Sequence, residues 1–266
     1  MLLAQKNGLT VRLSKTLAEV KAAQRLRYQI FYEELSANPT AEAAEVRLDI
    51  DRFDDFCDHL LVVEDGIFSG EVTGTSVGEG TLVGTYRLLR QDVAKAHGGF
   101  YSEGEFDLEP LLSRKSNLRF LEVGRSCVAP RFRSKPVAEL LWQGIWNYVR
   151  HYRLEVMLGC ASLAGTNCEV LADELSFLAH VAPAPAEWHV EARADHRVNF
   201  SPKPMATINQ KSVLKRLPTL VKAYLRLGCY IGDGAVIDTQ FNTTDILIVQ
   251  PVSTINPKYF NHYGAP

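Results

Sequence analysis

The segment from Arg119 to Tyr152 constrains the fold of this chain more than any other part of the sequence. Its first part, Arg119–Val128, predicts a strand, and the apolar spacing from Pro136 onward predicts a long amphipathic helix. A proline suits the first helical turn, where no N–H partner is needed. The turn between strand and helix is basic, and the free N–H groups of a helix N-terminus bind anions. The segment therefore predicts either a phosphate or pyrophosphate site or an ordinary solvated turn.

The order of the predicted elements favours a single domain, residues 1–266, of α/β (α+β) class with a mixed sheet. A strand and a helix come first, a run of strands follows, and strands then alternate with helices. Residues 38–47 are read as a polar connection, whereas residues 180–244 are too long for a plain loop and are predicted to be a basic, partly helical insertion or lid before the last strand. The predicted strands are 8–13, 59–64, 81–89, 119–128, 155–162 and 245–252, and the predicted helices are 14–36, 136–152 and 166–178.

Composition excludes several classes of protein. Hydrophobic residues make up 46% and charged residues 23%, which is average for a globular protein and excludes general disorder. The apolar stretches are far shorter than the ~18 residues of a membrane span, and the N-terminus lacks the apolar region of a secretory signal, so a cytoplasmic location is expected. The five cysteines form no C-x-x-C pair and the seven histidines no H-x-x-x-H pair, so neither a disulfide framework nor a metal site is expected. No nucleotide-binding motif is present, and we expect no permanently bound cofactor.

The basic turn carries the first family resemblance. The run Arg133-Ser-Lys-Pro136-Val-Ala138 resembles the loop Gln/Arg-x-x-Gly-x-Gly/Ala, which holds the acyl carrier in the GCN5-related N-acyltransferase (GNAT) fold. Pro136 replaces the central glycine and leaves fewer N–H groups for the pyrophosphate of coenzyme A. The single phosphate of a phosphopantetheine arm on a carrier protein would need fewer N–H groups than a pyrophosphate does. The resemblance implies that the donor-binding residues are Cys127, Val128, Arg131, Arg133, Lys135 and Ala138.

Four further motifs resemble the acyl-homoserine-lactone synthases, and they appear in the same order as in that family. They are Arg27-x-x-x-Phe31, Asp51-x-x-Asp54, Arg87 after a Gly-Thr pair, and Glu122-x-x-Arg125.

The C-terminal part resembles a more specific family. Its motifs are Leu225–Gly228, the glycine-rich stretch Gly232–Asp245 and Asn256-Pro. They are similar to those of the L-ornithine Nα-acyltransferases that begin ornithine-lipid synthesis, which are also described as haemolysin-like. This resemblance extends from about Thr10 to the end of the chain. It implies direct transfer of a 3-hydroxyacyl group from acyl carrier protein to the α-amine of ornithine, giving lyso-ornithine lipid.

Glu122 and Arg125 are the predicted catalytic residues. Amine attack on a thioester needs a proton acceptor, and Glu122 is predicted to be that base, directly or through a water. The alternative is a structural ion pair with an arginine such as Arg87 or Arg125. Strict alternation along a strand would place Glu122 and Arg125 on opposite faces, so a common site requires a bulge near Gly124. Such a bulge would also free N–H groups near Cys127 for the thioester oxygen.

The acceptor carries two ammonium groups, which makes acidic residues near it reasonable. Asp51 and Asp54 are predicted either to contact it or to pair with Arg27 and Arg87, because buried charges need partners. Either arginine could instead hold the substrate carboxylate by a bidentate contact. Asp233, with Asp238 and Asp245, is a candidate for the side-chain amine. Cys127 is interpreted as core filling rather than as a nucleophile.

A strongly basic segment lies near the C-terminus. The net charge is −2, yet residues 197–227 contain seven Lys/Arg and no Asp or Glu, so the rest of the chain carries −9. Pro218 divides an apolar stripe with basic flanks into two predicted short helices. This pattern predicts binding to an anionic membrane surface or to an acidic carrier protein. Alternatively, the segment covers an acyl tunnel or is an ordinary solvated helix face. A peripheral location on the inner membrane follows from the first of these.

The function has three alternatives. An acyl-homoserine-lactone synthase or an acyltransferase for another amino acid would share these motifs, and a haemolysin-like membrane-binding protein would have no catalysis. Acyl length, acceptor identity and oligomeric state are not determined by the sequence.

Overall fold

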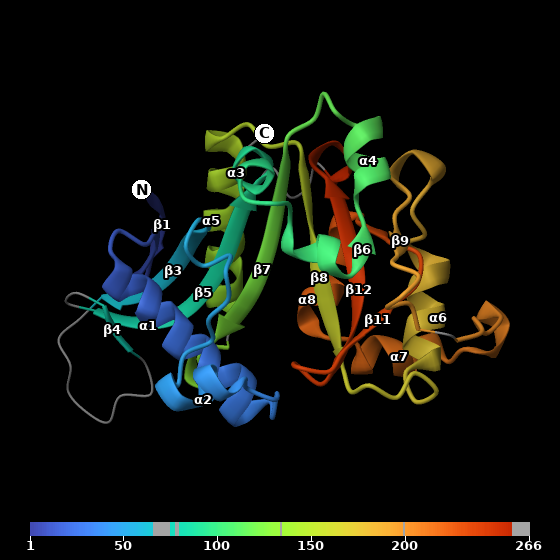
Figure 1. The fold of residues 1–266 in the computed structure, drawn as a ribbon, viewed down its shortest axis with the longest axis horizontal. Coiled ribbons are helices and arrows are strands. Elements are labelled where there is room, and N and C mark those ends of the chain that lie inside the picture. The colour runs from blue at the N-terminus through green and yellow to red at the C-terminus, as the bar shows by residue number, and fades with distance from the viewer. Residues whose placement is uncertain (66–74, 78–79, 134, 199, 257–266) are drawn as a thin grey trace. The chain divides into compact units, whose positions relative to one another are not determined.

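The computed structural model describes the chain except for residues 66–74, 78–79, 134, 199 and 257–266, and the side chains at 75–77, 135 and 136 are outside the description as well. The chain divides into two compact units. Unit 1 comprises residues 1–97 and 123–153, and unit 2 comprises residues 98–122 and 154–266. Strand β7 contributes to both units (Figure 1). The predicted single domain stays a prediction.

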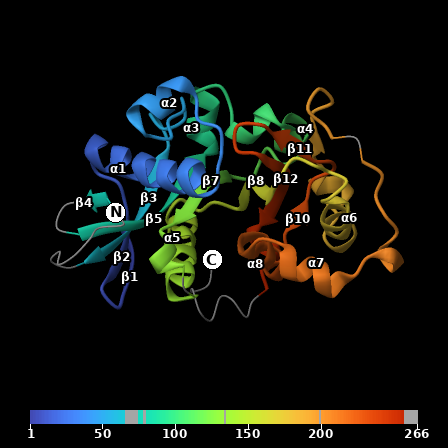
Figure 2. The same cartoon turned by 90° about the horizontal axis from the view of Figure 1, so that it is seen from below.

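Unit 1 is built around an antiparallel array with the strand order β1-β2-β3-β5-β7, and β4 pairs with β5. Helix α1 packs on one face of these strands, where Ala23 and Leu26 lie in a buried cluster with Leu61. Helix α5 packs on the other face (Figure 2), where Gly144 approaches Val11 and Leu60 so closely that a Cβ would lie 2.5 Å from Val11 Cγ1. The elements are β1 (Leu2–Lys6), β2 (Leu9–Leu13), α1 (Leu17–Tyr28), a π-helical turn (Gln29–Glu34), α2 (Ala41–Val46), β3 (Asp58–Asp65), β4 (Thr75–Val77), β5 (Gly80–Arg90), α3 (Gln91–Ala96), β7 (Phe120–Val128), a 3-10 turn (Pro130–Phe132) and α5 (Lys135–His151).

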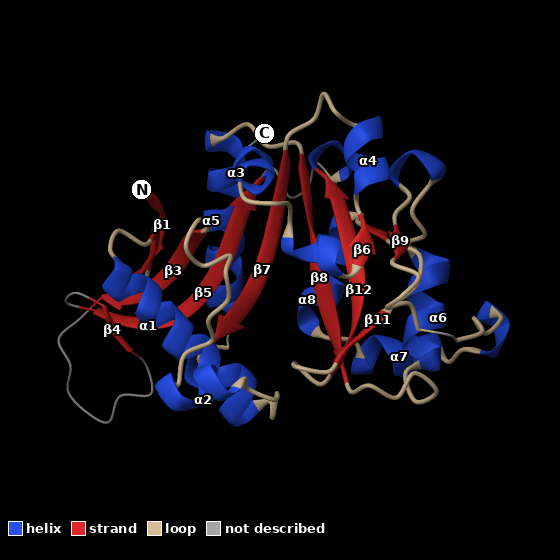
Figure 3. Ribbon diagram, in the orientation of Figure 1, coloured by secondary structure: helices blue, strands red, loops and turns tan. Residues whose placement is uncertain are grey.

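Unit 2 is built on two long strands, β8 and β12, which pair antiparallel over nine residues (Figure 3). The start of β7 adds a short parallel ladder to β8, from Phe120–Val156 to Glu122–Leu158. The elements are β6 (Phe106–Asp107), α4 (Glu109–Arg114), β8 (Val156–Ala164), α6 (Ala172–Val181), β9 (Glu191–Ala192), α7 (Gln210–Arg216), α8 (Thr219–Leu227), β10 (Tyr230–Ile231), β11 (Val236–Asp238) and β12 (Thr243–Pro251), with 3-10 turns at Tyr101–Gly104, Ala186–Trp188, Met205–Thr207 and Val252–Thr254.

The mixed α/β class and all six predicted strands are confirmed. One predicted connection and two predicted helices need correction. The predicted connection 38–47 contains α2, because Thr40 caps an Ala/Glu-rich run by accepting the Ala43 N–H. The helix predicted over 14–36 begins at Leu17 and changes to π-helical geometry after Tyr28. The helix predicted over 166–178 begins only at Ala172, because the Asn167 side chain accepts the N–H groups of residues 169 and 170 in a turn.

The basic segment forms two short helices, α7 and α8, as the proline predicted. Most of its apolar stripe faces inward, since Val213, Leu217, Val221 and Tyr224 are buried, whereas Leu214 is 42% exposed. The predicted insertion also contains the short strands β9, β10 and β11, so it is not helical throughout. No helix among the described residues is both long enough and apolar enough to span a bilayer.

Ion pairs divide the seven basic residues of this segment into two groups. Lys203 binds Asp173 at 2.7 Å, Arg197 binds Asp233 at 3.0 Å, and Arg216 binds Glu174. These contacts tie the segment to α6 and to the turn after β10. The other four basic residues make no ion pair with any described part of the chain: Lys211, Lys215, Lys222 and Arg226.

Candidate active site

Several of the predicted site residues of unit 1 lie together in a buried ring of charges. Arg27, at 1% exposure, donates to both carboxylate oxygens of Asp54, at 2.9 and 2.8 Å, and its Nε lies 2.8 Å from Asp49 Oδ2. Arg87 Nη1 donates to Asp51 Oδ1 at 2.6 Å and to Asp54 Oδ1 at 3.2 Å. The pairing that was the alternative role of Asp51 and Asp54 is therefore present in the structure.

Arg125 closes the ring. Its Nη2 donates to Asp51 Oδ2 at 3.0 Å, and its Nε lies 3.2 Å from Asp49 Oδ2. Each of the three aspartates is thus shared by two arginines. Tyr32 and Gln24, both on the first helical segment, donate further bonds to Asp49 and Asp54. The ring fastens this helix and the 49–54 loop to β5 and β7, and a contact of its members with substrate stays a prediction.

The electrostatics of the ring keep it charged. Burial opposes the charge on Arg27, but the attraction of Asp49 and Asp54 raises its pKa above the ordinary value. Burial likewise opposes the charge of Asp54, yet Arg27 and Arg87 lower its pKa well below the usual range. Burial and the neighbouring Arg27 lower the pKa of His59, whose Nε2 lies 3.1 Å from the Asp54 carbonyl oxygen. A neutral His59 therefore adds no positive charge to the ring at neutral pH.

The backbone of β7 departs from regular strand geometry where the sequence predicted it. Arg125, next to Gly124, has a φ of 50°, in the left-handed region that non-glycine residues rarely adopt. The Arg125 side chain points to the aspartate ring of unit 1. The predicted release of N–H groups at Cys127 and Val128 toward a thioester stays a prediction.

Glu122 lies in unit 2, on the part of β7 that pairs with β8, and is 5% exposed. Its Oε2 accepts the Tyr101 N–H and its Oε1 accepts the Ser102 N–H, both at 2.7 Å. The carboxylate therefore anchors the 3-10 turn Tyr101–Gly104. The predicted role of this carboxylate as the base stays a prediction.

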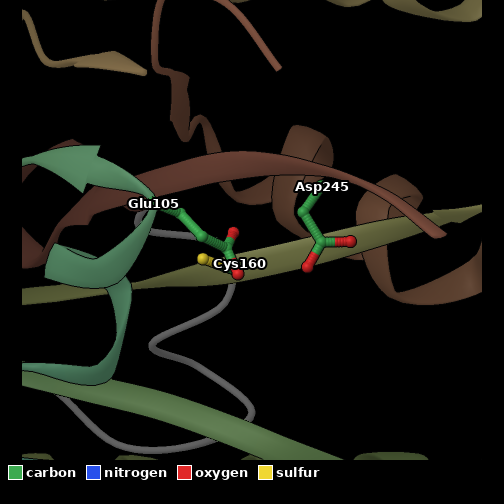
Figure 4. Close-up of side chains that lie close together, drawn as sticks. All are labelled: Glu105, Cys160 and Asp245. Carbon is green, nitrogen blue, oxygen red and sulfur yellow. The ribbon is translucent and has the colours of Figure 1, made fainter. Parts of the chain in front are cut away.

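Three side chains of unit 2 converge beside this turn (Figure 4). Ligand atoms of Glu105, Cys160 and Asp245 all lie within 4.8 Å of one another. Asp245 is 5% exposed, and the Cys160 Sγ donates to Ser102 Oγ at 3.4 Å. Burial first, and then the carboxylates of Glu105 and Asp245, raise the pKa of the Cys160 thiol well above its ordinary value. The cluster thus holds two carboxyl groups and a protonated thiol, and Asp245 Oδ1 also accepts the Thr243 hydroxyl at 2.8 Å.

Strand register places this cluster and Glu122 on one face of the unit 2 sheet. Glu122 lies opposite Leu158, and Cys160 is two residues further along β8. Cys160 in turn lies opposite Leu247, two residues from Asp245 on β12. The Ser102 N–H and hydroxyl bridge Glu122 to Cys160. Glu122 and the cluster of Glu105, Cys160 and Asp245 therefore share one face of unit 2.

The predicted donor residues are described in part. Cys127 is 6% exposed in the apolar core beneath α1, and burial raises the pKa of its thiol to about 12, as expected for core filling. The Val128 carbonyl accepts the Arg133 Nε–H at 2.9 Å, and Arg133 also binds both carboxylate oxygens of Glu34. Arg133 is thus engaged within unit 1, which explains why its pKa is raised. The predicted role of Arg133 in donor binding stays a prediction.

Arg131 and Ala138 are exposed, and Arg131 makes no ion pair within the described residues. The side chain of Lys135 lies outside the described residues. Asp233, predicted to bind the acceptor, is exposed and pairs with Arg197.

Sequence reasoning missed Asp49, Ser102, Glu105 and Cys160. Asp49 lies two residues before Asp51, and the number of buried arginines that need a carboxylate partner was the only signal for it. Glu105 and Cys160 stand in no motif, and only the pairing of β8 with β12 and the turn before β6 bring them together.

Comparisons with known proteins agree with this architecture. A family described as an acetyltransferase (GNAT) domain matches residues 26–143. The chain is 47% identical over 258 residues to a protein named L-ornithine N(alpha)-acyltransferase from Rhizobium meliloti (strain 1021), covering 97% of this chain and 85% of that protein. It is 45% identical over 266 residues to a protein of the same name from Brucella abortus (strain 2308), covering 100% and 92%.

Among solved structures, an N-acyl amino acid synthase from uncultured soil microbes has a TM-score of 0.52 at 12% identity, covering 95% of this chain and 98% of that one. This likeness concerns the fold alone. Together with the matched domain, it confirms the GNAT fold predicted from the loop before α5.

Proposed function

Because this chain is an acyltransferase that belongs to the family of L-ornithine N(alpha)-acyltransferases, we propose that it transfers a 3-hydroxyacyl group from acyl carrier protein to the α-amine of L-ornithine. The product is lyso-ornithine lipid. The observation that carries the choice of acceptor is the cluster of Glu105, Cys160 and Asp245 in unit 2. Two carboxyl groups beside a neutral thiol favour an acceptor with a second ammonium group, which ornithine has and most amino acids lack.

The acceptor is oriented by its two amines. Glu105 and Asp245 hold the side-chain ammonium, and the α-amine approaches Glu122 on the same face. A protonated thiol at Cys160 favours an ammonium over a metal ion in this cluster, because a metal ligand must be a thiolate. Glu122 takes the proton of the attacking amine, directly or through a water, and its two backbone hydrogen bonds hold its orientation.

The reaction proceeds by direct attack without an acyl-enzyme. The amine nitrogen forms the new amide bond, the thioester C–S bond breaks, and the phosphopantetheine thiol leaves. The buried thiols of Cys127 and Cys160 have raised pKa values and are therefore poor nucleophiles at neutral pH.

The donor is a phosphopantetheine thioester on a carrier protein. The basic turn before α5 keeps Arg131 exposed and unpaired among the described residues, which suits a phosphate or an acidic protein surface. Beyond Leu158, β8 pairs with β12 alone in the described part of the chain. Its other edge therefore offers backbone groups to an extended, amide-containing chain such as pantetheine.

The protein also associates with anionic membrane surfaces from the cytoplasmic side. The four unpaired basic residues of α7 and α8 carry this proposal, because Val213, Leu217, Val221 and Tyr224 of the apolar stripe are buried and leave little apolar surface to insert. The contact is therefore electrostatic and reversible. A membrane location suits an enzyme whose product is an amphiphile.

The acceptor assignment is tested with ornithine and norvaline, which differ only in the side-chain amine. Purified protein is incubated with 3-hydroxyacyl carrier protein and each amino acid, and the products are identified by mass. We expect Glu105→Gln and Asp245→Asn each to lower kcat/KM for ornithine by about 10- to 100-fold, with little change for norvaline. Asp107→Asn, an exposed acid two residues from Glu105, is the matched control.

The outcomes separate the rivals. Equal rates with ornithine and norvaline in the parent protein would assign the enzyme to another amino acid. An acyl-homoserine-lactone product would assign it to the synthases. Efficient use of acyl-coenzyme A by the parent protein would contradict the choice of donor.

A further inference from the structure

We propose that His189, Glu191 and Asp233 of unit 2 form a binding site for a divalent transition-metal ion of the Zn²⁺ type. Ligand atoms of all three side chains lie within 4.8 Å of one another, and His189 Nδ1 is 3.8 Å from Glu191 Oε1. One imidazole and two carboxylates are ligands that Zn²⁺ accepts, with water in the fourth position. The site is independent of the proposed acyl transfer.

Backbone pairing brings the three ligands together. His189 is extended, so its side chain and that of Glu191, two residues later, point to the same side. Glu191 is bridged in parallel to Asp233. The Asp233 N–H donates to the Val190 carbonyl at 2.7 Å, and the Ala192 N–H donates to the Asp233 carbonyl at 2.8 Å.

The flanking residues hold both segments in place. Arg114 donates to the His189 carbonyl, and Lys115 lies over the Trp188 ring, 4.4 Å from its centroid. On the other segment, Gly234 has a φ of 89°, and a Cβ there would lie 3.0 Å from Ala192 Cβ. The ligands are thus presented by fixed backbone, and a metal needs only side-chain rotation.

Charge and access also favour a cation. The two carboxylates outweigh the single guanidinium of Arg197, which binds Asp233 Oδ1 at 3.0 Å. The ligand side chains of His189, Glu191 and Asp233 are 39, 58 and 50% exposed, so an ion reaches them without opening the fold. The imidazole of His189 favours Zn²⁺ over Mg²⁺ and Ca²⁺, which prefer oxygen ligands.

The site lies at a cavity of about 280 Å³, whose lining includes His189, Arg197 and Asp233 among mostly apolar residues of α6 and of the chain at Val198, Phe200 and Pro202. A bound ion would cross-link the segment before β9 to the turn after β10. We therefore expect metal binding to raise the unfolding temperature as well as to give a binding signal.

The test is calorimetric titration of the tag-free, full-length protein with ZnCl₂ in excess Mg²⁺, together with thermal unfolding. We expect one saturable site, with affinity lowered by about tenfold or more in His189→Gln, Glu191→Gln and Asp233→Asn. Glu187→Gln, which removes a nearby exposed charge outside the cluster, should bind like the parent. Arg197→Gln should bind about two- to fivefold more tightly, because it removes the competing cation.

Three results would overturn the proposal. The first is the absence of saturable Zn²⁺ binding. The second is binding that survives all three ligand substitutions, and the third is a thiolate band in the spectrum of the protein with Co²⁺ in place of Zn²⁺. Either of the last two places the metal elsewhere. Circular dichroism of each variant shows that it is folded before its affinity is compared.

Discussion

Glu122→Gln replaces one carboxylate oxygen by an NH₂ group at a position where both oxygens accept backbone N–H groups. In the parent protein these donors are Tyr101 and Ser102, both at 2.7 Å. Glutamine has a single acceptor oxygen, so one of the two N–H groups must face an amide NH₂. The substitution therefore removes a negative charge and also breaks one anchor of the Tyr101–Gly104 turn.

The two consequences have different magnitudes. A hydrogen bond to a charged group contributes about 1.5–3 kcal/mol, and a buried donor without an acceptor costs about 1–3 kcal/mol. Because Glu122 is 5% exposed, water cannot readily replace the lost acceptor. We expect the free energy of unfolding to fall by about 2–4 kcal/mol. If Glu122 is the base, kcat should also fall by about 10²–10⁴.

Denaturant unfolding gives the first quantity, and steady-state kinetics with carrier-protein donor at a temperature where the variant is folded gives the second. Glu122→Asp retains the charge and serves as the companion variant. A stability loss with kcat within about tenfold of the parent would move the base elsewhere and leave Glu122 as an anchor. An unchanged free energy of unfolding would refute the reasoning from the two N–H bonds.

The remaining predictions concern the charge ring, the core and the basic surface. Asp54→Asn should lower the free energy of unfolding by about 3–5 kcal/mol at neutral pH; because Arg27 lowers the pKa of Asp54, this contribution is complete above about pH 4 and is lost as the pH falls below it, so unfolding of parent and variant should converge in acid. Gly144→Ala should cost about 1–3 kcal/mol in denaturant unfolding, because its Cβ would lie 2.5 Å from a side chain across the helix–sheet contact, whereas Gly104→Ala has open space and should cost far less. Removing three of the unpaired basic charges should weaken binding to anionic vesicles by about 10²-fold in a flotation assay. The binding should depend steeply on salt, and turnover of soluble substrates should be retained. An equal loss of binding in a control variant that lacks three exposed lysines of unit 1 would show that the effect is not specific to α7 and α8. The test set is Lys211, Lys215 and Arg226 to Gln, and the control set is Lys6, Lys15 and Lys21 to Gln.

The strands and the main helix could be predicted because their signals are local. The predicted strand 155–162 and the predicted helix 136–152 agree with β8 and α5 within two residues at each end. In each case apolar residues recur at the period of the element, and burial of that face decides the structure. Short elements such as β9 and β10 were missed, since two residues carry no periodicity.

The candidate site could be predicted only where it coincides with a motif. Arg27, Asp54 and Arg125 stand in recognisable patterns and do lie in one ring. The sequence could not show that Arg133 is engaged by Glu34, because that pair joins residues 99 positions apart. The sequence also predicted no metal site, because His189 and Asp233 are far apart along the chain and form no recognised metal-binding motif.

The sequence by itself determined the mixed α/β class, the family resemblance, the uneven distribution of charge and the division of the basic segment at Pro218. These features depend on neighbours along the chain, through side-chain period, backbone sterics and summed charge. The tertiary structure alone decided which charges are paired, that most of the apolar face of α7 and α8 is buried, and that Glu105, Cys160 and Asp245 converge. Such contacts depend on strand register and on the desolvation of groups distant in sequence, which no local pattern encodes.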